Sequence, residues 1–438
     1  MCLATFGILF ILVQQQYKPG VFSIILVNHI LQVIAAVLLA NYLNKDINER
    51  SPYISKALVV SLVGIIFLFI PLIIYQRSLP TLTLNKLKEY AQEFSIGKVL
   101  YCYIIALVAT SLLSAVAFVF GSITQIIISL IKIKWFFFLL FGFMVFLKQE
   151  KKRVFYLLVL FEFLSGFFSF FSDFKTVIYY LIILYVTFIE KVNLKSLLLA
   201  FTAGIFLVFI GLFWTSIKND YRAFLNSGSQ TQEIDVSQND AYNKLYDLSS
   251  SVDQDVLANS TISLLDRLQY IYHFSKAIET VPDKIPFQNG NNWLDNLEFS
   301  TTPRFLNPDK PKINNSIKTT KYTGIRYLGA DKGVSFSLGY FAEAYIDFGF
   351  LGMPIFLLGI GFLYTIIANY LKKNSSDNPL FAYAVLGSFF MEFYGFEMDG
   401  TYLIGRLFSS FLTYFILIKF FFPSILEFIK VRDEPEYY

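Results

Sequence analysis

The sequence has little charge, almost no histidine and almost no cysteine. Charged residues make up 16% of the 438 residues and hydrophobic residues 55%, whereas a soluble domain carries about 25% charge. Cys2 and Cys102 both lie in apolar runs, so we expect buried hydrophobic side chains there and no disulfide. His29 also lies in an apolar run, where we expect it to be hydrogen-bonded within the structure. Without a cluster of cysteine and histidine, the sequence offers no zinc site.

Long apolar runs are what the sequence has in abundance. They recur at close to 20 residues, which predicts an all-α polytopic membrane protein with about 10–11 transmembrane helices. A shorter apolar run, Gly121–Ile133, is predicted to be re-entrant or to lie in the membrane interface. The expected spans are 20–43, 57–76, 99–119, 134–147, 154–171, 176–189, 195–216, 337–371, 379–396 and 401–422, with residues 1–13 as a poorly delimited first span.

The spans divide the chain into three parts. Residues 1–216 form an N-terminal transmembrane bundle, 217–336 a large extracytoplasmic loop, and 337–438 the C-terminal transmembrane helices with a short cytoplasmic tail. The basic loop Lys148–Arg153 is expected in the cytoplasm, which places the large loop on the outer side. Upstream, Lys45–Lys56 and Arg77–Lys98 are both basic although adjacent loops must alternate, so the orientation of the first spans stays open.

The large loop is expected to contain short helices. Gly228–Asp255 is rich in serine, asparagine, glutamine and aspartate, which is typical of a mobile connector. Thr261–Ile278 has apolar residues at helical spacing and is predicted to form one amphipathic helix that Pro282 ends. The pair Asp253 and Asp255 has the spacing of a metal-binding Asp-x-Asp, but we discount it because it lies in the connector.

Cations on the predicted outer side are candidates for binding an anion. A diphosphate needs several convergent guanidinium or ammonium groups for its recognition and departure. The alternative for each cation alone is a solvated or snorkelling side chain. The outer cations are Lys175, Arg222, Arg267, Arg304, Lys310, Arg326 and Arg406, the last within the first turns of a span, where a charge is costly unless it finds a partner.

Carboxylates near the same boundary are candidates for accepting a proton. Glu343 is the best placed, at the outer rim of a span, and its alternative role is to pair with a nearby arginine. Asp347 and His273 are further candidates, although His273 is expected to be a solvated surface side chain. Glu162 and Glu392 lie inside predicted spans, where they would mark a cavity or, in a transporter, an ion path.

One run in the large loop carries a family resemblance. Residues Pro303–Pro311 read Pro-Arg-Phe-Leu-Asn-Pro-Asp-Lys-Pro, and the three prolines make this a rigid extended segment that displays Arg304 and Lys310. The run resembles the PR-x-L-x-P-x-KP loop of bacterial O-antigen and oligosaccharide repeat-unit polymerases, the Wzy-type enzymes. Asn307 stands where that family commonly has tryptophan.

Three further motifs are similar to that family and occur in consistent order over about residues 155–375. They are Asn219-Asp220-Tyr221-Arg222 after a span, the helix with Arg267 leading to Val281-Pro282-Asp283, and Gly339-Tyr340-Phe341-Ala342-Glu343-Ala344-Tyr345 followed by Phe348–Gly352.

The resemblance implies a GT-C-like glycosyltransferase in the bacterial cytoplasmic (inner) membrane. It implies polymerisation of undecaprenyl-diphosphate-linked repeat units without a metal or other cofactor. Partners would be these lipid-linked glycans, membrane lipid and a chain-length regulator protein, and no nucleic acid. The residues that would bind diphosphate are Arg222, Arg267, Arg304, Lys310 and Arg406, and Arg304 would also be catalytic together with Glu343 near the acceptor.

Two other functions stay open. A ligase of the O-antigen type would pass finished glycan to another acceptor by the same chemistry. A transporter or flippase of lipid-linked sugars would instead use the ionisable groups inside the membrane, Glu162, Glu392 and His29. A transporter would be favoured by a pair of matching interrupted spans, one in each half of the chain, and we find no such pair.

Overall fold

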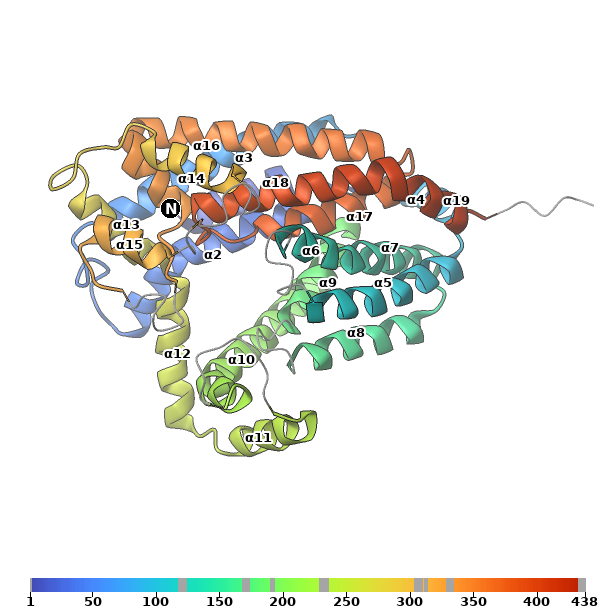
Figure 1. Ribbon diagram of the computed structural model, residues 1–438, viewed down its shortest axis with the longest axis horizontal. Helices are drawn as coiled ribbons and strands as arrows, with labels where there is room; N and C mark the ends of the chain where they lie inside the picture. The colour runs from blue at the N-terminus through green and yellow to red at the C-terminus, as the bar shows by residue number, and fades with distance from the viewer. Residues whose placement is uncertain are drawn as a thin grey trace, which may run out of the picture.

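In the computed structural model, the described residues are 2–116, 124–167, 174–189, 194–227, 236–302, 310, 314–327 and 335–431. These residues fold almost wholly into helices. In chain order the helices are α1 (Cys2–Val13), α2 (Val21–Tyr42), α3 (Ile54–Ser78), α4 (Leu84–Gln92), α5 (Ile96–Val116), α6 (Thr124–Ile131), α7 (Ile133–Lys148), α8 (Lys152–Phe167), α9 (Phe174–Phe188), α10 (Leu194–Leu225), α11 (Gln238–Ser250), α12 (Gln254–Leu268), α13 (Tyr270–Thr280), α14 (Asn291–Thr301), α15 (Asn315–Thr323), α16 (Tyr340–Ser375), α17 (Pro379–Phe390), η2 (Met391–Phe393), α18 (Gly400–Ile416), η3 (Leu417–Phe421) and α19 (Phe422–Ile429). Helices α3, α16 and α18 run along the long axis of the molecule, and α12 lies across it (Figure 1).

Among the described residues, 6 helices are long and apolar enough to cross a membrane. These are Val21–Tyr42, Ile54–Ser78, Ile96–Ser114, Thr124–Lys148, Tyr340–Ser375 and Gly400–Ile429, and α9 and the segment Pro379–Phe393 are shorter apolar helices. A chain with several such helices is a multi-pass membrane protein.

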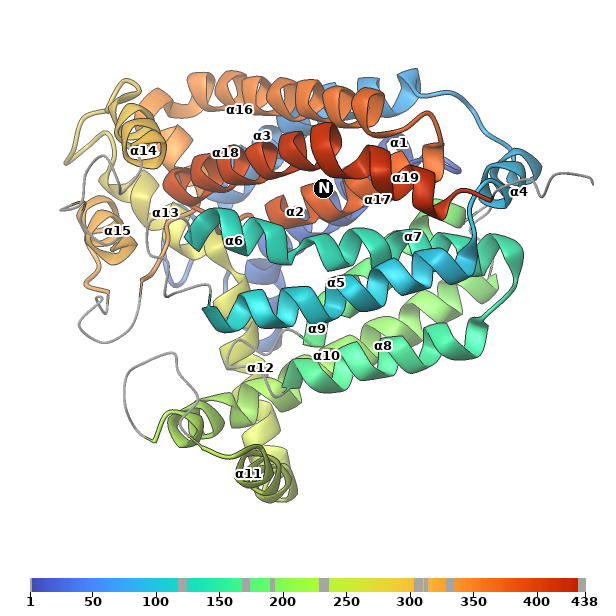
Figure 2. The same cartoon turned by 45° about the vertical axis from the view of Figure 1, so that its right-hand side comes forward.

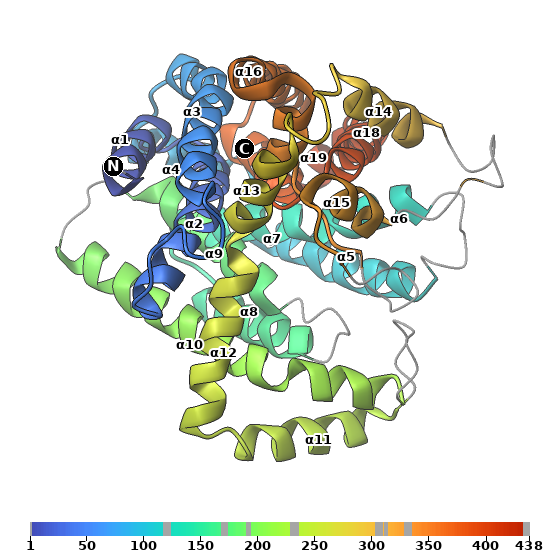
Figure 3. The ribbon, with the colours of Figure 1, turned by 90° about the vertical axis from the view of Figure 1, so that its left-hand side faces the viewer.

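Different helices cover the two ends of the bundle. Helices α13, α14 and α15 gather at one end (Figure 3), while α4 and α19 lie at the other (Figures 1 and 2). The second end also holds Lys148, at the end of α7, and Lys372 and Lys373, in the last turn of α16. The positive-inside rule predicts that basic loops face the cytoplasm. In line with this prediction, we call the end that α13–α15 cover the outer end of the bundle.

In this arrangement the two basic loops near the N-terminus lie far apart. Arg50 lies at the outer end, because its guanidinium pairs with Asp266 of α12 and lies 4.4 Å from the ring centroid of Tyr272. Phe94 lies at the opposite end, where it forms a backbone bridge with Lys430. The two loops therefore lie at opposite ends of the bundle, and the same prediction would make Lys45–Lys56 external and Arg77–Lys98 cytoplasmic.

Helices α3 and α16 pack closely because glycines face the contact. A Cβ atom on Gly64 would lie 2.7 Å from Leu357 Cδ1, and one on Gly361 would lie 3.1 Å from the backbone carbon of Leu68. Small residues let backbones approach where lipid provides no hydrophobic force between helices. The start of α16 is thereby fixed against the bundle, and the functional candidates lie there.

The structure corrects four local expectations. Residues 124–131 form α6, and the helical run Thr124–Lys148 is long and apolar enough to be one candidate span, where we expected a span that begins at residue 134. Helix α10 continues through Leu225, which places Arg222 in its last turn. Within the predicted connector, residues 238–250 form α11. The predicted amphipathic helix is interrupted at Gln269, whose φ of −81° and ψ of 69° are not helical, and becomes α12 and α13.

Candidate functional site

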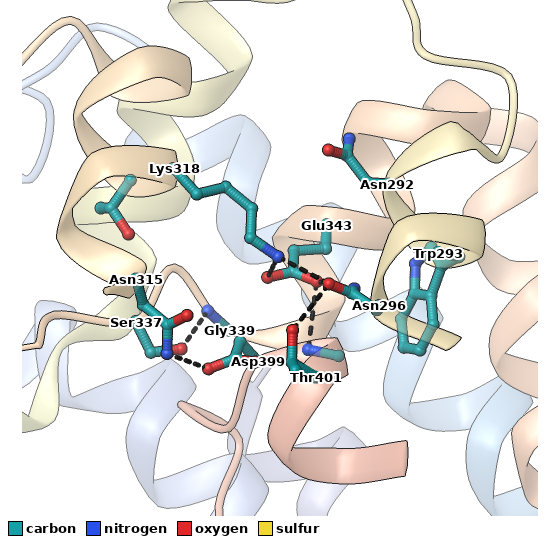
Figure 4. Close-up of polar contacts among 12 residues, drawn as sticks. Asn292, Trp293, Asn296, Asn315, Lys318, Ser337, Gly339, Glu343, Asp399 and Thr401 are labelled. Carbon is teal, nitrogen blue, oxygen red and sulfur yellow. Dashed lines mark hydrogen bonds and ion pairs between the residues drawn. The ribbon is translucent and has the colours of Figure 1, made fainter. Parts of the chain in front are cut away.

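The outer end of the bundle is built on the first turns of α16 and α18. Gly339 precedes α16 with a φ of 86°, a left-handed value that glycine adopts without steric cost. A backbone bond of 2.7 Å from Tyr340 N to Met398 O then ties this start to the residues before α18. Helices α14 and α15 of the large loop cover both starts, so side chains from four helices meet there (Figure 4).

Glu343 lies in the first turn of α16 and is fully buried. Its Oε1 pairs with Lys318 Nζ of α15 at 2.8 Å, and the lysine side chain remains 22% exposed (Figure 4). Burial alone would lower the pKa of Lys318, but the charges of Glu343 and Asp399 raise it above its ordinary value. This geometry favours the role in which Glu343 is the partner of a cation, and the cation is Lys318 rather than an arginine.

Asn296 of α14 connects the same carboxylate to α18. Its Nδ2 donates to Glu343 Oε2 at 2.8 Å, and its Oδ1 accepts from Lys318 Nζ at 3.0 Å and from Thr401 Oγ1 at 2.8 Å (Figure 4). Gly400 N also donates to Glu343 Oε2, at 3.1 Å. Oε2 of Glu343 therefore accepts two hydrogen bonds and Oε1 is held by the ion pair with Lys318, so the buried charge is compensated.

Asp399 supplies a second buried carboxylate at the start of α18. Its Oδ1 caps the helix by accepting from Tyr402 N at 3.0 Å, and its Oδ2 accepts from Asn315 Nδ2 of α15. Burial and the nearby charge of Glu343 raise the pKa of Asp399 above its usual range, although Lys318 opposes this shift. The cluster thus holds two acids for one lysine.

Asp347 lies one turn further along α16 and anchors α14. Its Oδ1 accepts from Asn292 Nδ2 at 2.8 Å and its Oδ2 from Trp293 N at 3.1 Å. Tyr322 of α15 completes the connection by donating to Asn292 Oδ1 at 3.0 Å. Asp347, predicted as a candidate base, is thus buried in the structure that joins α14, α15 and α16.

The segment Tyr394–Asp399, between η2 and α18, carries a more accessible acid. Glu397 is partly buried, and its Oε2 accepts a hydrogen bond from Gln32 Nε2 of α2. Gln32 Oε1 in turn accepts from Phe396 N at 2.9 Å. One glutamine therefore holds both the backbone and the acid of this segment.

Two of the predicted arginines share electrostatic partners with this segment. Tyr270, at the start of α13, interacts electrostatically with Glu397, Asp399 and Arg267. Tyr394 interacts with Glu397 and with Arg406, whose Nη1 donates to Glu392 O at 3.4 Å. Arg267 is exposed in the last turn of α12, and Arg406 is half-buried in the second turn of α18, where the sequence placed it.

The other predicted cations are placed differently. Lys310 Nζ binds the end of α14 by donating to Phe299 O and, at 2.8 Å, to Thr302 O, and it lies 4.0 Å from the Phe299 ring centroid. Arg222 lies in α10, which packs against α11. Arg304 and the rest of its proline-rich run, apart from Lys310, lie outside the described residues.

Aromatic rings line the outer end beside these charges. Phe336 stacks between Tyr270 and Tyr327, with ring centroids 5.8 and 4.7 Å away. His273 packs edge-on against Phe336 at 4.5 Å, and its Nδ1 lies 2.6 Å from Tyr327 OH. Burial lowers the pKa of His273 to about 4, which corrects the expectation of a solvated histidine. We call Tyr270, His273, Tyr327 and Phe336 the aromatic wall.

Sequence reasoning missed several members of the site. Asp399 gives a recognisable signal, because an aspartate directly before an apolar run is a common helix cap. Lys318, Asn296 and Glu397 give none, since nothing in their local sequence distinguishes them from loop residues. His29, by contrast, is the hydrogen-bonded structural residue that was expected, with Nε2 2.7 Å from Tyr340 OH.

The fold and the site together define a helical, multi-pass membrane protein with a buried polar cluster at its outer end. The chain belongs to the family described as Domain of unknown function (DUF8712), which matches residues 48–427. No curated protein and no solved structure matches the chain.

Proposed function

We propose that this protein polymerises undecaprenyl-diphosphate-linked oligosaccharide repeat units at the outer face of the cytoplasmic membrane, as the resemblance to Wzy-type enzymes implies. The observation that carries the proposal is Arg406, a half-buried arginine that donates to Glu392 O just before the segment Tyr394–Asp399, which also holds the accessible acid Glu397. Glycosyl transfer from a lipid diphosphate needs cations for the departing group and an acceptor for a proton.

The charges of the outer end support an anionic substrate. Glu343 already neutralises Lys318, so this lysine positions the site more than it attracts a ligand. Arg406, in contrast, makes only one long bond, to a carbonyl oxygen, among the contacts of the described residues. A guanidinium has five donors, so most of those of Arg406 are available to a phosphate that enters from the membrane.

The aromatic wall supports a sugar substrate. Ligand sites combine aromatic surface with a few placed polar groups. Tyrosine offers both, since its ring contacts the apolar face of a sugar while its hydroxyl bonds the sugar's own hydroxyls. Tyr270 links the wall to Glu397 and Asp399, so a glycan on the wall would lie next to the acids.

The finer architecture belongs to the same proposal. About 10–11 passes, a GT-C-like arrangement and a location in the bacterial inner membrane would accompany the activity. The chain would need no metal, because arginines would offset the charge that develops on the diphosphate. Membrane lipid and a chain-length regulator protein would be its further partners.

Two alternative functions make different predictions. A ligase would use the same site but transfer finished polymer, so only the product separates it from a polymerase. For a transporter, the charges inside the membrane would have to be available. Glu162 instead pairs with Lys134 at 2.8 Å and accepts from Tyr103 OH at 2.7 Å. Partnered charges of this kind are expected of a structural ion pair, which favours the enzyme.

Deletion of the gene tests the proposal in the cell. We expect single repeat units on the surface lipid if the protein polymerises, free lipid-linked polymer if it ligates, and intracellular repeat units if it transports. Arg267→Ala and Arg406→Ala should each shorten the polymer without reducing protein level. A charge-assisted hydrogen bond contributes about 1.5–3 kcal/mol, so each variant should slow polymerisation roughly tenfold to a hundredfold.

Arg77→Ala is the matched control. Arg77 is exposed in the last turn of α3, at the cytoplasmic end, so its loss changes the net charge equally but leaves the outer end intact. Polymer of normal length in the two outer variants, at normal protein level, would remove the observation on which the proposal rests.

A further inference from the structure

Resting on the proposed function, we infer that Glu397 is the catalytic residue that accepts the proton of the acceptor hydroxyl. The inference starts from which acids at the outer end can reach a substrate. Glu343, Asp347 and Asp399 are at most 1% exposed. Each of the three has both carboxylate oxygens bonded, to side chains or backbone N–H groups of the site.

Two further acids near the cluster are paired with cations, whereas Asp295 and Glu298 of α14 are exposed and no hydrogen bond or ion pair among the described residues holds their side chains. Glu392 Oε1 lies 3.5 Å from Lys132 Nζ, and Asp266 pairs with Arg50. Glu397 differs from all of them, because Oε2 accepts from Gln32 and Oε1 has no hydrogen-bond or ion-pair partner among the described residues. An acid held by one oxygen with the other open is the geometry that a general base requires.

The surroundings of Glu397 fit the same role. Four tyrosines interact with it electrostatically, and they come from α9, α13, α16 and the segment before α18: Tyr179, Tyr270, Tyr340 and Tyr394. Tyr270 belongs to the aromatic wall, so an acceptor sugar on the wall would present its hydroxyl to Glu397. Arg267 and Arg406 would face the diphosphate of the donor.

The chemical step balances without a further reagent. The acceptor hydroxyl gives its proton to Glu397 Oε1 while its oxygen forms a bond to C1 of the donor glycan. The bond from C1 to the diphosphate oxygen breaks, and its electron pair stays on the departing undecaprenyl diphosphate. Glu397 afterwards releases the proton to water. Glu343 takes no part in this transfer and acts as a positioning residue for Lys318 and α18.

The test uses full-length protein in detergent with lipid-linked repeat units extracted from cells that lack the gene. Glu397→Gln should lower kcat by roughly a hundredfold to ten thousandfold, the range of general-base catalysis, with KM changed less than about threefold. Glu397→Asp should keep part of the activity. Asp295→Asn is the matched control, because Asp295 is an exposed acid on the same end of the molecule. A folded Glu397→Gln protein within threefold of the wild-type rate overturns the inference.

A second measurement on the wild-type protein covers the case in which Glu397→Gln does not fold. A carbodiimide with a small amine should label Glu397 in step with loss of activity, and extracted lipid-linked repeat units should protect it. Glu343 should stay unlabelled because it is buried. Full labelling of Glu397 with activity retained overturns the inference. A wild-type protein that extends no glycan at all would instead refute the proposed function, so the two failures are distinguishable.

Discussion

The pair Lys318–Glu343 makes a quantitative prediction about stability. Lys318→Met removes the ammonium group and leaves the carboxylate of Glu343 buried, with only Asn296 and Gly400 as donors. Glu343→Gln removes the charge and leaves the ammonium group of Lys318, 22% exposed, without its ion-pair partner, although the charge of Asp399 remains nearby. A buried charge without its partner is costly, so both variants should be less stable than the wild type.

The size of the loss follows from the burial of each partner. Breaking a buried pair costs about 3–5 kcal/mol, and Lys318→Met should fall in this range because Glu343 is fully buried. Glu343→Gln should cost less, about 1–3 kcal/mol, since water reaches part of the lysine. In the wild type the pKa of Lys318 lies above its ordinary value, so the lysine stays charged throughout the neutral pH range. The double variant should recover about 2 kcal/mol of the summed losses.

The assay is denaturant unfolding in detergent, followed by tryptophan fluorescence. Trp293 of α14 lies next to the site and packs on Phe356, with ring centroids 4.5 Å apart, so its emission should report the opening of this region. Single variants that each lose under about 0.5 kcal/mol, or losses that simply add in the double variant, would contradict a buried, coupled pair.

Three further variants test other parts of the structure. Gly400→Ala should cost about 1–3 kcal/mol, because its Cβ would lie 2.8 Å from Glu343 Oε2; stability equal to wild type would show that this contact is not close. Gly361→Ala should lower the melting temperature, because its Cβ would press on the backbone of Leu68; an unchanged value would argue against the packing of α3 on α16. Burial lowers the pKa of His273 to about 4, below its value of about 6.5 in the unfolded chain. The stability that the neutral histidine contributes is therefore fully present above pH 6.5 and is lost as the pH falls toward 4. The stability advantage of wild type over His273→Gln should therefore shrink by about 1–2 kcal/mol between pH 7 and pH 4.5, and a constant difference would mean that the histidine is solvated.

The sequence predicted the membrane helices better than the outer loop. Apolar composition marks a span directly, and α3, α16 and α18 start within a few residues of their expected positions. The interruption at Gln269 could not be predicted, because the apolar spacing on its two sides continues as if in one helix. The helix at residues 238–250 was missed because its composition is polar, and it depends on Ser237 as its cap.

The residues of the candidate site could likewise be predicted from the sequence only in part. The cations Arg267 and Arg406 could be selected by charge and by their place relative to the spans. Glu343 could be selected too, but its partner could not, because Lys318 is distant in sequence and meets it only through the packing of α15 on the outer end. Glu397 is positioned by a hydrogen bond from Gln32 of α2, which lies 365 residues away in the chain, so its role could not be predicted from its neighbours in sequence.

The central claim is that this membrane protein extends lipid-linked glycans at its outer end. The most direct measurement incubates purified full-length protein with undecaprenyl-diphosphate-linked repeat units and resolves the products by length. The account predicts a ladder of lipid-linked glycans that grows by whole repeat units in the presence of a metal chelator, and that is lost in Arg406→Ala. Repeat units that stay single with folded wild-type protein would contradict it.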